Sequence, residues 1–209
     1  MAEPVRRTQR ERVEASTRLL AEATVSLIAE RGFAATTTAE ICKRAGYSRA
    51  MVHARYGSKD ALLDSILTTH YEERMDIAPD PALNGLQQVL ARIDAFSEFA
   101  AEDGEFLRAV FVLQFEATRG TAELRQRVAT WVDRERQGFI HAIQNGVDDG
   151  SIRADLHAIH EATDLIASGI GIAYLWVTDA TDTPIGPTLG RWRSRVASRL
   201  HSRPSVDEV

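Results

Sequence analysis

The chain has one cysteine among its 209 residues, Cys42, so it cannot form a disulfide bond within itself. Small disulfide-stapled scaffolds are therefore excluded, and so little cysteine suits the reducing cytosol. Aromatic residues make up 7% of the chain, while 44% of its residues are hydrophobic and 26% are charged. This composition is that of an ordinary globular protein and excludes an intrinsically disordered one.

A long apolar segment is also lacking. The longest apolar run, LIASGIGIAYLWV, extends only from Leu165 to Val177. A helix that spans a bilayer needs about 20 apolar residues, so this run predicts a buried helix instead. The N-terminal stretch MAEPVRRTQRERVEAS is basic but has no apolar run behind it. We therefore expect no signal peptide and a cytoplasmic protein.

Motifs of common enzyme chemistry are absent from the sequence. It has no glycine-rich nucleotide-binding loop, no nucleophile elbow and no cysteine–histidine pair in a plausible setting. His157 and His160, beside Asp155, Glu161 and Asp164, have a spacing that two metal ligands on one helix can use. No further ligands follow at a recognisable spacing, and the polar first turn of a helix explains the same residues. We expect no catalytic residue, metal or cofactor.

Charge is distributed unevenly along the chain. The net charge is −5, yet residues 1–60 hold 11 Lys and Arg against 7 Asp and Glu, a balance of +4. The remaining residues carry −9. A basic N-terminal part, with a basic arm from Arg6 to Arg12, favours a polyanion-binding end on an acidic body. Chance clustering of charge is the alternative.

Helical periodicity runs through nearly every segment, and no segment alternates with the period of a β-strand. Glycines and prolines divide these segments, with Pro79 and Pro81 as the clearest break. The sequence therefore predicts an all-α protein of about nine helices. They are expected at 10–30, 38–45, 49–56, from Ser58 to the prolines, 82–101, 105–118, 121–148, 155–179 and 186–202.

Two of these helices are short and have clear cap residues. Thr37 and Glu40 predict a capping box at the start of the first, and Gly46 suits the left-handed position at its end. Ser48 can cap the second. Two short helices joined by a tight glycine-containing turn are typical of a helix-turn-helix, whose second helix enters the DNA major groove. A helical hairpin with surface arginines is the alternative.

The second short helix has the side chains that reading DNA requires. Arg49 can bind guanine bidentately, Ala50 allows close approach, and His53 follows one turn later on the same face. Flanking hydroxyls and cations can bind phosphates and so fix the register. The residues that we expect to contact DNA are Thr36, Thr37, Arg44, Tyr47, Ser48, Arg49, Ala50, His53, Tyr56 and Lys59.

The stretch LLAEATVSLIAERGFAATTTAEICKRAGYSRAMVHARYGSKDALL closely resembles the DNA-binding domain of TetR-family transcriptional regulators, over about residues 14–74. His53 stands where that family usually carries a tyrosine, and Arg55 where it carries an aromatic residue or histidine. The matching positions are Ala23, Gly32, Phe33, Thr36, Thr37, Thr38, Ile41, Ala45, Gly46, Ser48, Tyr56, Ser58, Lys59 and Leu62 or Leu63.

This resemblance implies an all-helical homodimer with a three-helix DNA-binding head and a divergent ligand-binding body. Ligand entry would shift the helix that joins the two parts and release DNA. The helix-turn-helix would comprise residues 37–56 within a DNA-binding domain at 10–74. Residues 75–205 would then form the ligand-binding and dimerisation domain.

Aromatic residues concentrate between positions 95 and 140. Such side chains around an apolar cavity would suit a hydrophobic or aromatic small molecule, and plain core packing is the alternative. The residues that we expect to bind a ligand are Phe96, Phe99, Phe111, Phe115, Trp131 and Phe139.

The apolar run from Leu165 to Val177 predicts a helix that must be covered on several sides. We expect this helix and the C-terminal helix of each of two chains to form a four-helix interface. The interface residues that we expect are Ile170, Trp176, Leu189, Trp192, Val196 and Leu200.

These observations predict a ligand-responsive transcriptional regulator, in the form of a repressor. It would bind a palindromic DNA operator as a homodimer and be released by a small hydrophobic or aromatic effector. The alternatives are a helical enzyme, a protein-only interaction module, or a small-molecule-binding protein whose DNA-binding head is no longer used.

Overall fold

The computed structural model describes residues 8–179 and 184–201. All regular elements in these ranges are helices, which confirms the all-α prediction. Arg6 and Arg7 of the basic arm lie outside the described residues. The elements are α1 (Gln9–Arg31), α2 (Thr38–Ala45), α3 (Arg49–Tyr56), α4 (Lys59–Leu67), the π-helical η1 (Thr68–Glu72), α5 (Glu73–Met75), α6 (Gly85–Glu102), α7 (Gly104–Glu116), the 3₁₀ turn η2 (Ala117–Arg119), α8 (Ala122–Asp148), α9 (Ala158–Val177) and α10 (Ile185–Leu200).

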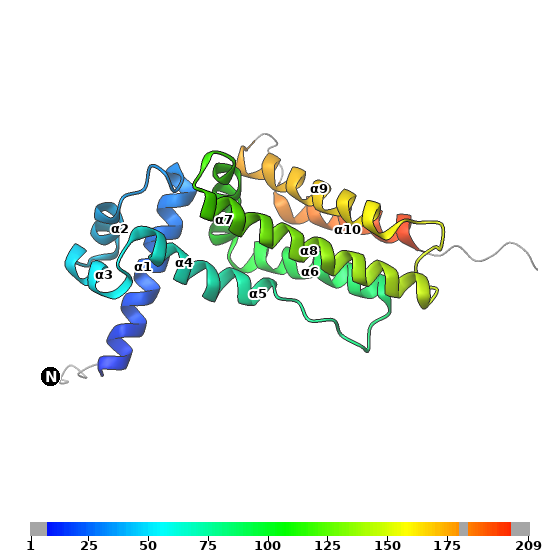
Figure 1. Cartoon of the computed structure of the whole chain (residues 1–209), viewed down its shortest axis with the longest axis horizontal. Coiled ribbons are helices and arrows are strands. Elements are labelled where there is room, and N and C mark those ends of the chain that lie inside the picture. The colour runs from blue at the N-terminus through cyan, green and yellow to red at the C-terminus, as the bar shows by residue number, and fades with distance from the viewer. Residues whose placement is uncertain (1–7, 180–183, 202–209) are drawn as a thin grey trace, which may run out of the picture.

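The molecule has a small head and an elongated body (Figure 1). In the head, α1 packs against α2, and α2 packs against α3. The body contains the long helices α6, α8, α9 and α10, which run roughly along the long axis of the molecule (Figure 1). Helix α4 leads from the head into the body, and α7 of the body packs against α1.

The hydrophobic core forms two clusters. The first fills the head, with Leu20, Ile41 and Val52, and continues into the body through Leu107 and Leu113 of α7. The second lies among α6, α8, α9 and α10. The first cluster is continuous across the predicted domain boundary after residue 74, so head and body share part of their core.

The helix that leads out of the head contains an unexpected feature. The sequence predicts one uninterrupted helix after Ser58, but the helix changes to π geometry between Thr68 and Glu72. Backbone dihedral angles stay helical at both ends of this turn, so α4, η1 and α5 form one continuous rod. A π-helical turn changes which side chains face the body, and such turns are frequent at functional sites.

No helix within residues 8–179 and 184–201 is both long enough and apolar enough to cross a membrane. The buried helix predicted from Leu165 to Val177 lies within α9 and is covered in part by α8 and α10.

Candidate DNA-reading face and ligand cavity

Local hydrogen bonds position the second short helix, α3. The hydroxyl of Thr37 accepts a hydrogen bond from the Glu40 backbone N–H at 3.3 Å, and a Glu40 carboxylate oxygen accepts one from the Thr37 N–H at 3.0 Å. Helix α2 then ends at Gly46, whose φ of 76° and ψ of 27° place it in the left-handed region. Because a side chain is strained there, glycine is the residue that permits this turn. Ser48 caps α3 by accepting the Met51 N–H at 3.2 Å.

One face of α3 is exposed to solvent. Arg49, Ala50 and His53 all lie on it. Neither Arg49 nor His53 forms a hydrogen bond or ion pair with another residue in the described part of the chain. Tyr47 and Tyr56 flank this face and are partly buried against the head core. The structure thus brings together the residues that were expected to read bases.

The opposite side of α3 is fastened to α1. A guanidinium N–H of Arg55 donates to the Ser16 hydroxyl at 2.8 Å, and the guanidinium also contacts Thr17. Val52 is buried between the helices. Arg55 therefore helps to set the orientation of α3 and does not belong to its free face. These contacts with α1 explain why an arginine can stand where the TetR family usually carries an aromatic residue or histidine.

Two residues that were expected to bind phosphate face inward instead. Thr36 is only 1% exposed, and its hydroxyl donates to the Gly32 carbonyl at 2.7 Å. The ammonium of Lys59 donates to the carbonyls of Phe33 and Thr36, at 2.9 Å each. It also lies 3.9 Å from the centre of the Phe33 ring. Both residues thus hold the loop between α1 and α2.

Arg44 remains exposed but is paired within the head. Its guanidinium donates to the Glu30 carboxylate at 2.9 Å and to the Ser26 hydroxyl at 3.0 Å. Hydrogen bonding from Arg44 lowers the pKa of Glu30, and hydrogen bonding from Thr37 lowers the pKa of Glu40. Burial raises the pKa of the Cys42 thiol, so this cysteine is a core residue rather than a reactive one.

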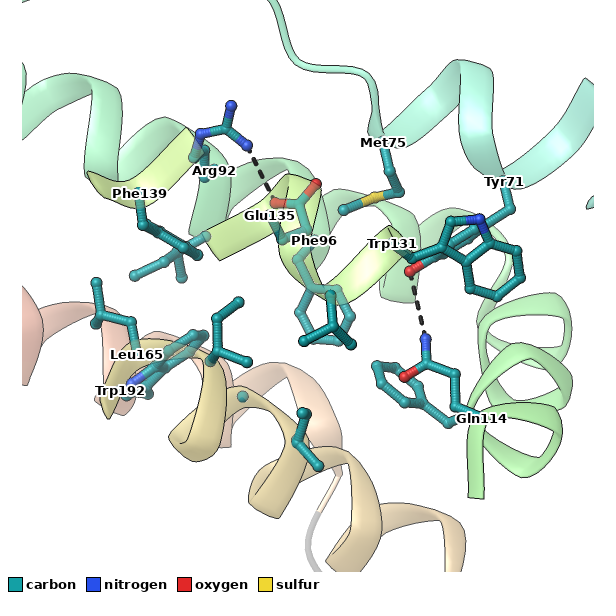
Figure 2. A pocket seen from close by; sticks show the side chains of 16 residues that line it. Tyr71, Met75, Arg92, Phe96, Gln114, Trp131, Glu135, Phe139, Leu165 and Trp192 are labelled. Carbon is teal, nitrogen blue, oxygen red and sulfur yellow. Dashed lines mark hydrogen bonds and ion pairs between the residues drawn. The ribbon is translucent and has the colours of Figure 1, made fainter. Parts of the chain in front are cut away.

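The body contains an apolar cavity of about 100 Å³, which we call the inner cavity (Figure 2). Of the six aromatic residues expected to bind ligand, Phe96, Phe111, Trp131 and Phe139 line it. The other two do not: Phe99 is core and stacks on Phe106 at 5.8 Å, and Phe115 packs edge-on against Tyr174 at 5.3 Å. The remaining lining residues are Tyr71, Met75, Arg92, Ile93, Gln114, Val132, Glu135, Leu165, Ile166, Gly169, Ile170 and Trp192.

Few polar groups reach the inner cavity. A guanidinium N–H of Arg92 donates to the Glu135 carboxylate at 3.1 Å, and the two side chains are only 12% and 19% exposed. Burial raises the pKa of Glu135, although the Arg92 charge opposes that shift. Gln114 donates to the hydroxyl of Tyr71 across a long 3.5 Å contact (Figure 2). Burial likewise raises the pKa of Tyr71.

The connecting helix contributes directly to the cavity wall. Tyr71 in the π-helical turn and Met75 in α5 both line the cavity. Neither residue could be recognised as cavity lining from the sequence, because both continue the apolar stripe of α4 and no local signal shows where that stripe passes from the head core to a cavity.

Glu72, beside Tyr71, links the cavity wall to the head. One of its carboxylate oxygens accepts the indole N–H of Trp131 at 2.7 Å and the Nε–H of Arg127 at 2.9 Å. Arg127 also donates to the Thr68 hydroxyl at 2.9 Å and pairs with Asp64 of α4. A chain of polar contacts therefore runs from Trp131 at the cavity to α4.

A second link joins α7 to the loop between α1 and α2. The Glu116 carboxylate accepts the backbone N–H of Phe33 at 2.8 Å and that of Ala34 at 3.4 Å. A Cβ atom on Gly32 would lie 1.8 Å from a Glu116 oxygen, so this contact requires glycine. A groove of about 700 Å³ also lies between head and body. Of its charged lining residues, Glu116, Lys59 and Arg127 are engaged in the contacts described above, and Asp60, Asp64, Arg119 and Glu123 also line it.

Most of the residues predicted at a dimer interface are buried within the chain itself. Leu189, Trp192, Val196 and Leu200 are at most 7% exposed, and they face the chain's own second core cluster. The apolar stripe of α10 is covered by α6. Trp176 is partly buried and packs against both core clusters. Ile170 lines the inner cavity, and Trp192 lines it as well as facing the core cluster.

Three of the exposed large apolar side chains of the described residues lie on α9, and the other two, Val13 and Leu19, lie on α1. Ile159, Tyr174 and Leu175 are 47%, 53% and 44% exposed, which is unusual for large hydrophobic side chains. Gly171 on the same face has open space around it. These three residues were not predicted from the sequence, because an apolar run alone does not show which side of the helix the rest of the chain covers.

The histidine pair near the start of α9 makes no metal cluster with its neighbours. Within the described ranges, no group of three or more potential ligands could hold a metal ion. The rings of His157 and His160 stack with their centres 4.2 Å apart. Glu161 and Asp164 pair with Arg199 at 2.9 and 3.2 Å.

Known sequences match both the head and the whole chain. Residues 20–66 match the sequence model for bacterial regulatory proteins of the tetR family. The HTH-type transcriptional regulator TtgR of Pseudomonas putida is 28% identical over 214 residues, which cover 97% of this chain and 99% of that protein. The HTH-type transcriptional repressor KstR2 of Mycolicibacterium smegmatis is 28% identical over 148 residues, or 66% of this chain and 67% of that protein.

Solved structures share the fold. A transcriptional regulator from Saccharomonospora viridis in complex with choline superposes with a TM-score of 0.73 at 19% identity, over 91% of this chain and 100% of that one. The fatty acid degradation regulator FadR of Bacillus halodurans superposes with a TM-score of 0.71 at 16% identity, over 90% of this chain and 97% of that one.

The helix-turn-helix head on a helical body, together with these relatives, defines a DNA-binding transcriptional regulator rather than an enzyme. The head of the chain matches the TetR family of transcriptional regulators over residues 20–66, and repressors are among the relatives of the chain.

Proposed function

We propose that the protein is a ligand-responsive repressor that binds a palindromic operator as a homodimer in the cytoplasm. Residues 10–74 form its DNA-binding domain, with the helix-turn-helix at 37–56, and residues 75–205 form its ligand-binding and dimerisation domain. The observation that carries this proposal is the free face of α3, where Arg49 and His53 are exposed and form no hydrogen bond or ion pair within the described chain.

The free face of α3 has the chemistry for reading bases. Arg49 is exposed at the N-terminal end of α3, the part of a recognition helix that reaches base edges. Its guanidinium can bind O6 and N7 of guanine together. Ala50 leaves room for close approach, and Ser48 and Thr37 lie near helix N-termini where phosphate binds well. Arg44, Tyr47 and Tyr56 are the flanking contacts.

Two chains are needed to read a palindromic site, and α9 offers a surface for pairing. Its exposed side has Ile159, Tyr174 and Leu175, and the absence of a side chain at Gly171 allows a second helix to approach. Tyr174 and Leu175 are adjacent in the chain, and neighbouring exposed large apolar side chains are typical of an interface. We propose that α9 and the outward side of α10 from each chain form a four-helix interface.

The effector is a small molecule with an apolar or aromatic part, because the inner cavity is lined largely by rings and aliphatic side chains. Its binding displaces Tyr71 and Trp131, and the contacts of Glu72 and Arg127 transmit this change to α4. A ligand changes the position of the head only if it binds more tightly to the protein in one head position than in the other.

Selection of binding sites from random duplex DNA tests this proposal. The purified protein is expected to enrich a palindromic motif whose affinity falls with rising salt. Arg49→Ala should lower affinity for the selected site and relax preference at one base pair in each half-site, at a cost of about 1–3 kcal/mol. Arg136→Ala, on α8 of the body, is the control that should bind like the wild type.

Absence of any enriched motif from the fully folded wild-type protein would overturn the DNA-binding proposal. That result would favour the alternative, a small-molecule-binding protein whose head is no longer used. Enrichment of a motif that Arg49→Ala leaves unchanged would show instead that another surface reads the DNA.

A further inference from the structure

The inner cavity is small for an effector site. Its volume is about 100 Å³. Sites for small molecules usually measure about 300–1,000 Å³, and an apolar cavity of about 150 Å³ in another protein binds benzene. A ring can therefore enter the inner cavity only if side chains of its wall, such as Tyr71 and Trp131, move outward, and the rest of the ligand has to extend beyond the cavity.

A second space shares one lining residue, Arg92, with the inner cavity and is lined by α6, α8 and the segment before α6. We call this space the outer hollow, and its volume is about 350 Å³. Together the two spaces reach the usual size of a ligand site. The outer hollow is lined by Ile77, Ala78, Pro79, Asp80, Leu83, Gln88, Ala91, Arg92, Arg134, Gln137, Gly138, His141 and Ala142.

Arg92 is the only described residue that lines both spaces. One terminal nitrogen of its guanidinium donates to Glu135 at 3.1 Å, and the other donates to the Ile77 carbonyl at 3.2 Å. A Cβ atom on Gly138 would lie 2.1 Å from the guanidinium carbon, so the Arg92 side chain occupies its position only because α8 has glycine there. Figure 2 shows Arg92 and Glu135 together at one edge of the inner cavity.

The two spaces differ in chemistry. The inner cavity is aromatic and aliphatic, whereas the outer hollow has two arginines, Arg92 and Arg134, against one acid, Asp80. Arg134 is exposed and forms no hydrogen bond or ion pair with any other described residue. Arg92 uses two of its five N–H donors in the contacts above, so it keeps donors for a further acceptor.

We propose that the two spaces form one site for an elongated amphiphile with an aromatic end and a carboxylate end. The ring occupies the inner cavity among Phe96, Phe111 and Trp131, and a short alkyl chain passes Arg92. The carboxylate lies in the outer hollow, where Arg92 and Arg134 bind it with charge-assisted hydrogen bonds. This inference rests on the proposed function, because it names the class of effector for the same cavity.

Three probes with the same ring and chain test the inference by calorimetric titration: 4-phenylbutyrate, 4-phenylbutan-1-ol and 4-phenylbutylamine. The carboxylate is expected to bind about tenfold or more tightly than the alcohol, and the amine most weakly. Phenylacetate, whose chain is too short to pass Arg92, should bind more weakly than 4-phenylbutyrate. Equal affinity of acid and alcohol, equal affinity of the two acids, or no binding by any probe would overturn the inference.

Two variants locate the carboxylate. Arg134→Met changes an exposed side chain and should reduce the preference for acid over alcohol while leaving alcohol binding unchanged. Arg92→Met should abolish that preference. Arg136→Met, on the same helix but lining neither space, is the matched control. Preservation of the preference in both Arg92→Met and Arg134→Met would overturn the assignment of the outer hollow.

The outcomes for this inference and for the proposed function can be separated. Binding of 4-phenylbutyrate as expected, without any enriched DNA motif, would leave the amphiphile site standing and remove the DNA-binding role. An enriched motif without binding of the probes would support the DNA-binding role and remove the amphiphile site.

Discussion

Replacing Glu72 with alanine tests the polar link between the cavity and the connecting helix. One Glu72 oxygen accepts N–H groups from Trp131 and Arg127. Trp131 is 4% exposed, so Glu72→Ala leaves a buried indole N–H without an acceptor, which costs about 1–3 kcal/mol. Arg127 keeps its contact with Asp64 and is 21% exposed, so loss of the contact between Glu72 and Arg127 costs less, about 1 kcal/mol or less. We expect Glu72→Ala to lower the free energy of unfolding by about 2–3 kcal/mol.

Urea denaturation at fixed protein concentration measures this effect. With a slope of about 2–3 kcal/mol/M, the midpoint should fall by about 1 M. Glu73→Ala removes the same charge from the neighbouring exposed position and should change the midpoint little. Glu72→Gln keeps an acceptor for the Trp131 N–H and should lie between Glu72→Ala and the wild type.

A double-mutant cycle separates the Trp131 contact from the rest. In a Trp131→Phe background no indole N–H is left unpaired, so Glu72→Ala should then cost about 1 kcal/mol or less. The same cost in both backgrounds would refute the reasoning, because it would show that Trp131 and Glu72 are not energetically coupled. Hydrogen exchange of α4 in the same proteins reports whether the connecting helix loosens when this link is lost.

Three further predictions concern the head and the exposed side of α9. Thr37→Ala removes the capping box and should cost about 1 kcal/mol in urea denaturation, whereas Thr37→Ser should cost less. Gly46→Ala should cost about 1–2 kcal/mol from backbone strain alone, since φ is 76° and no atom lies within 4 Å of the added Cβ. Tyr174→Arg should convert the proposed dimer to a monomer in light scattering, whereas Tyr174→Phe should not.

Each of these predictions has a clear contrary result. Equal stability of Thr37→Ala and the wild type would mean that the capping box contributes nothing to the head. A neutral or stabilising Gly46→Ala would contradict strain at a left-handed position. An intact dimer in Tyr174→Arg would place the subunit interface elsewhere on the molecule.

Local signals in the sequence were sufficient for the helix-turn-helix. Thr37, Glu40, Gly46 and Ser48 act on backbone groups a few residues away, and the structure shows each of them in its expected capping or turn position. The all-α fold followed in the same way from helical periodicity and from breaks at glycine and proline. None of these features depends on contacts between distant parts of the chain.

Whether a side chain packs in the core, lines the cavity or stays free for a ligand was harder to predict than the helices themselves. Thr36 and Lys59 had the residue types of phosphate ligands, but distant backbone carbonyls bind the Lys59 ammonium and the fold buries the Thr36 hydroxyl. Phe99 and Phe96 stand three residues apart on α6, yet one is core and the other lines the cavity. A single apolar stripe on α10 could face either a partner or the chain itself, and α6 covers it.

The sequence by itself therefore determined the class of fold, the helix-turn-helix and its exposed reading helix, because caps, turns and periodicity are interactions between near neighbours. Only the tertiary structure decided which aromatic residues surround the inner cavity and which side of α9 stays exposed. It also decided that Arg92, opposite Gly138, lies between the two spaces. These features depend on how each helix is rotated against partners far away in the chain, which no local pattern records.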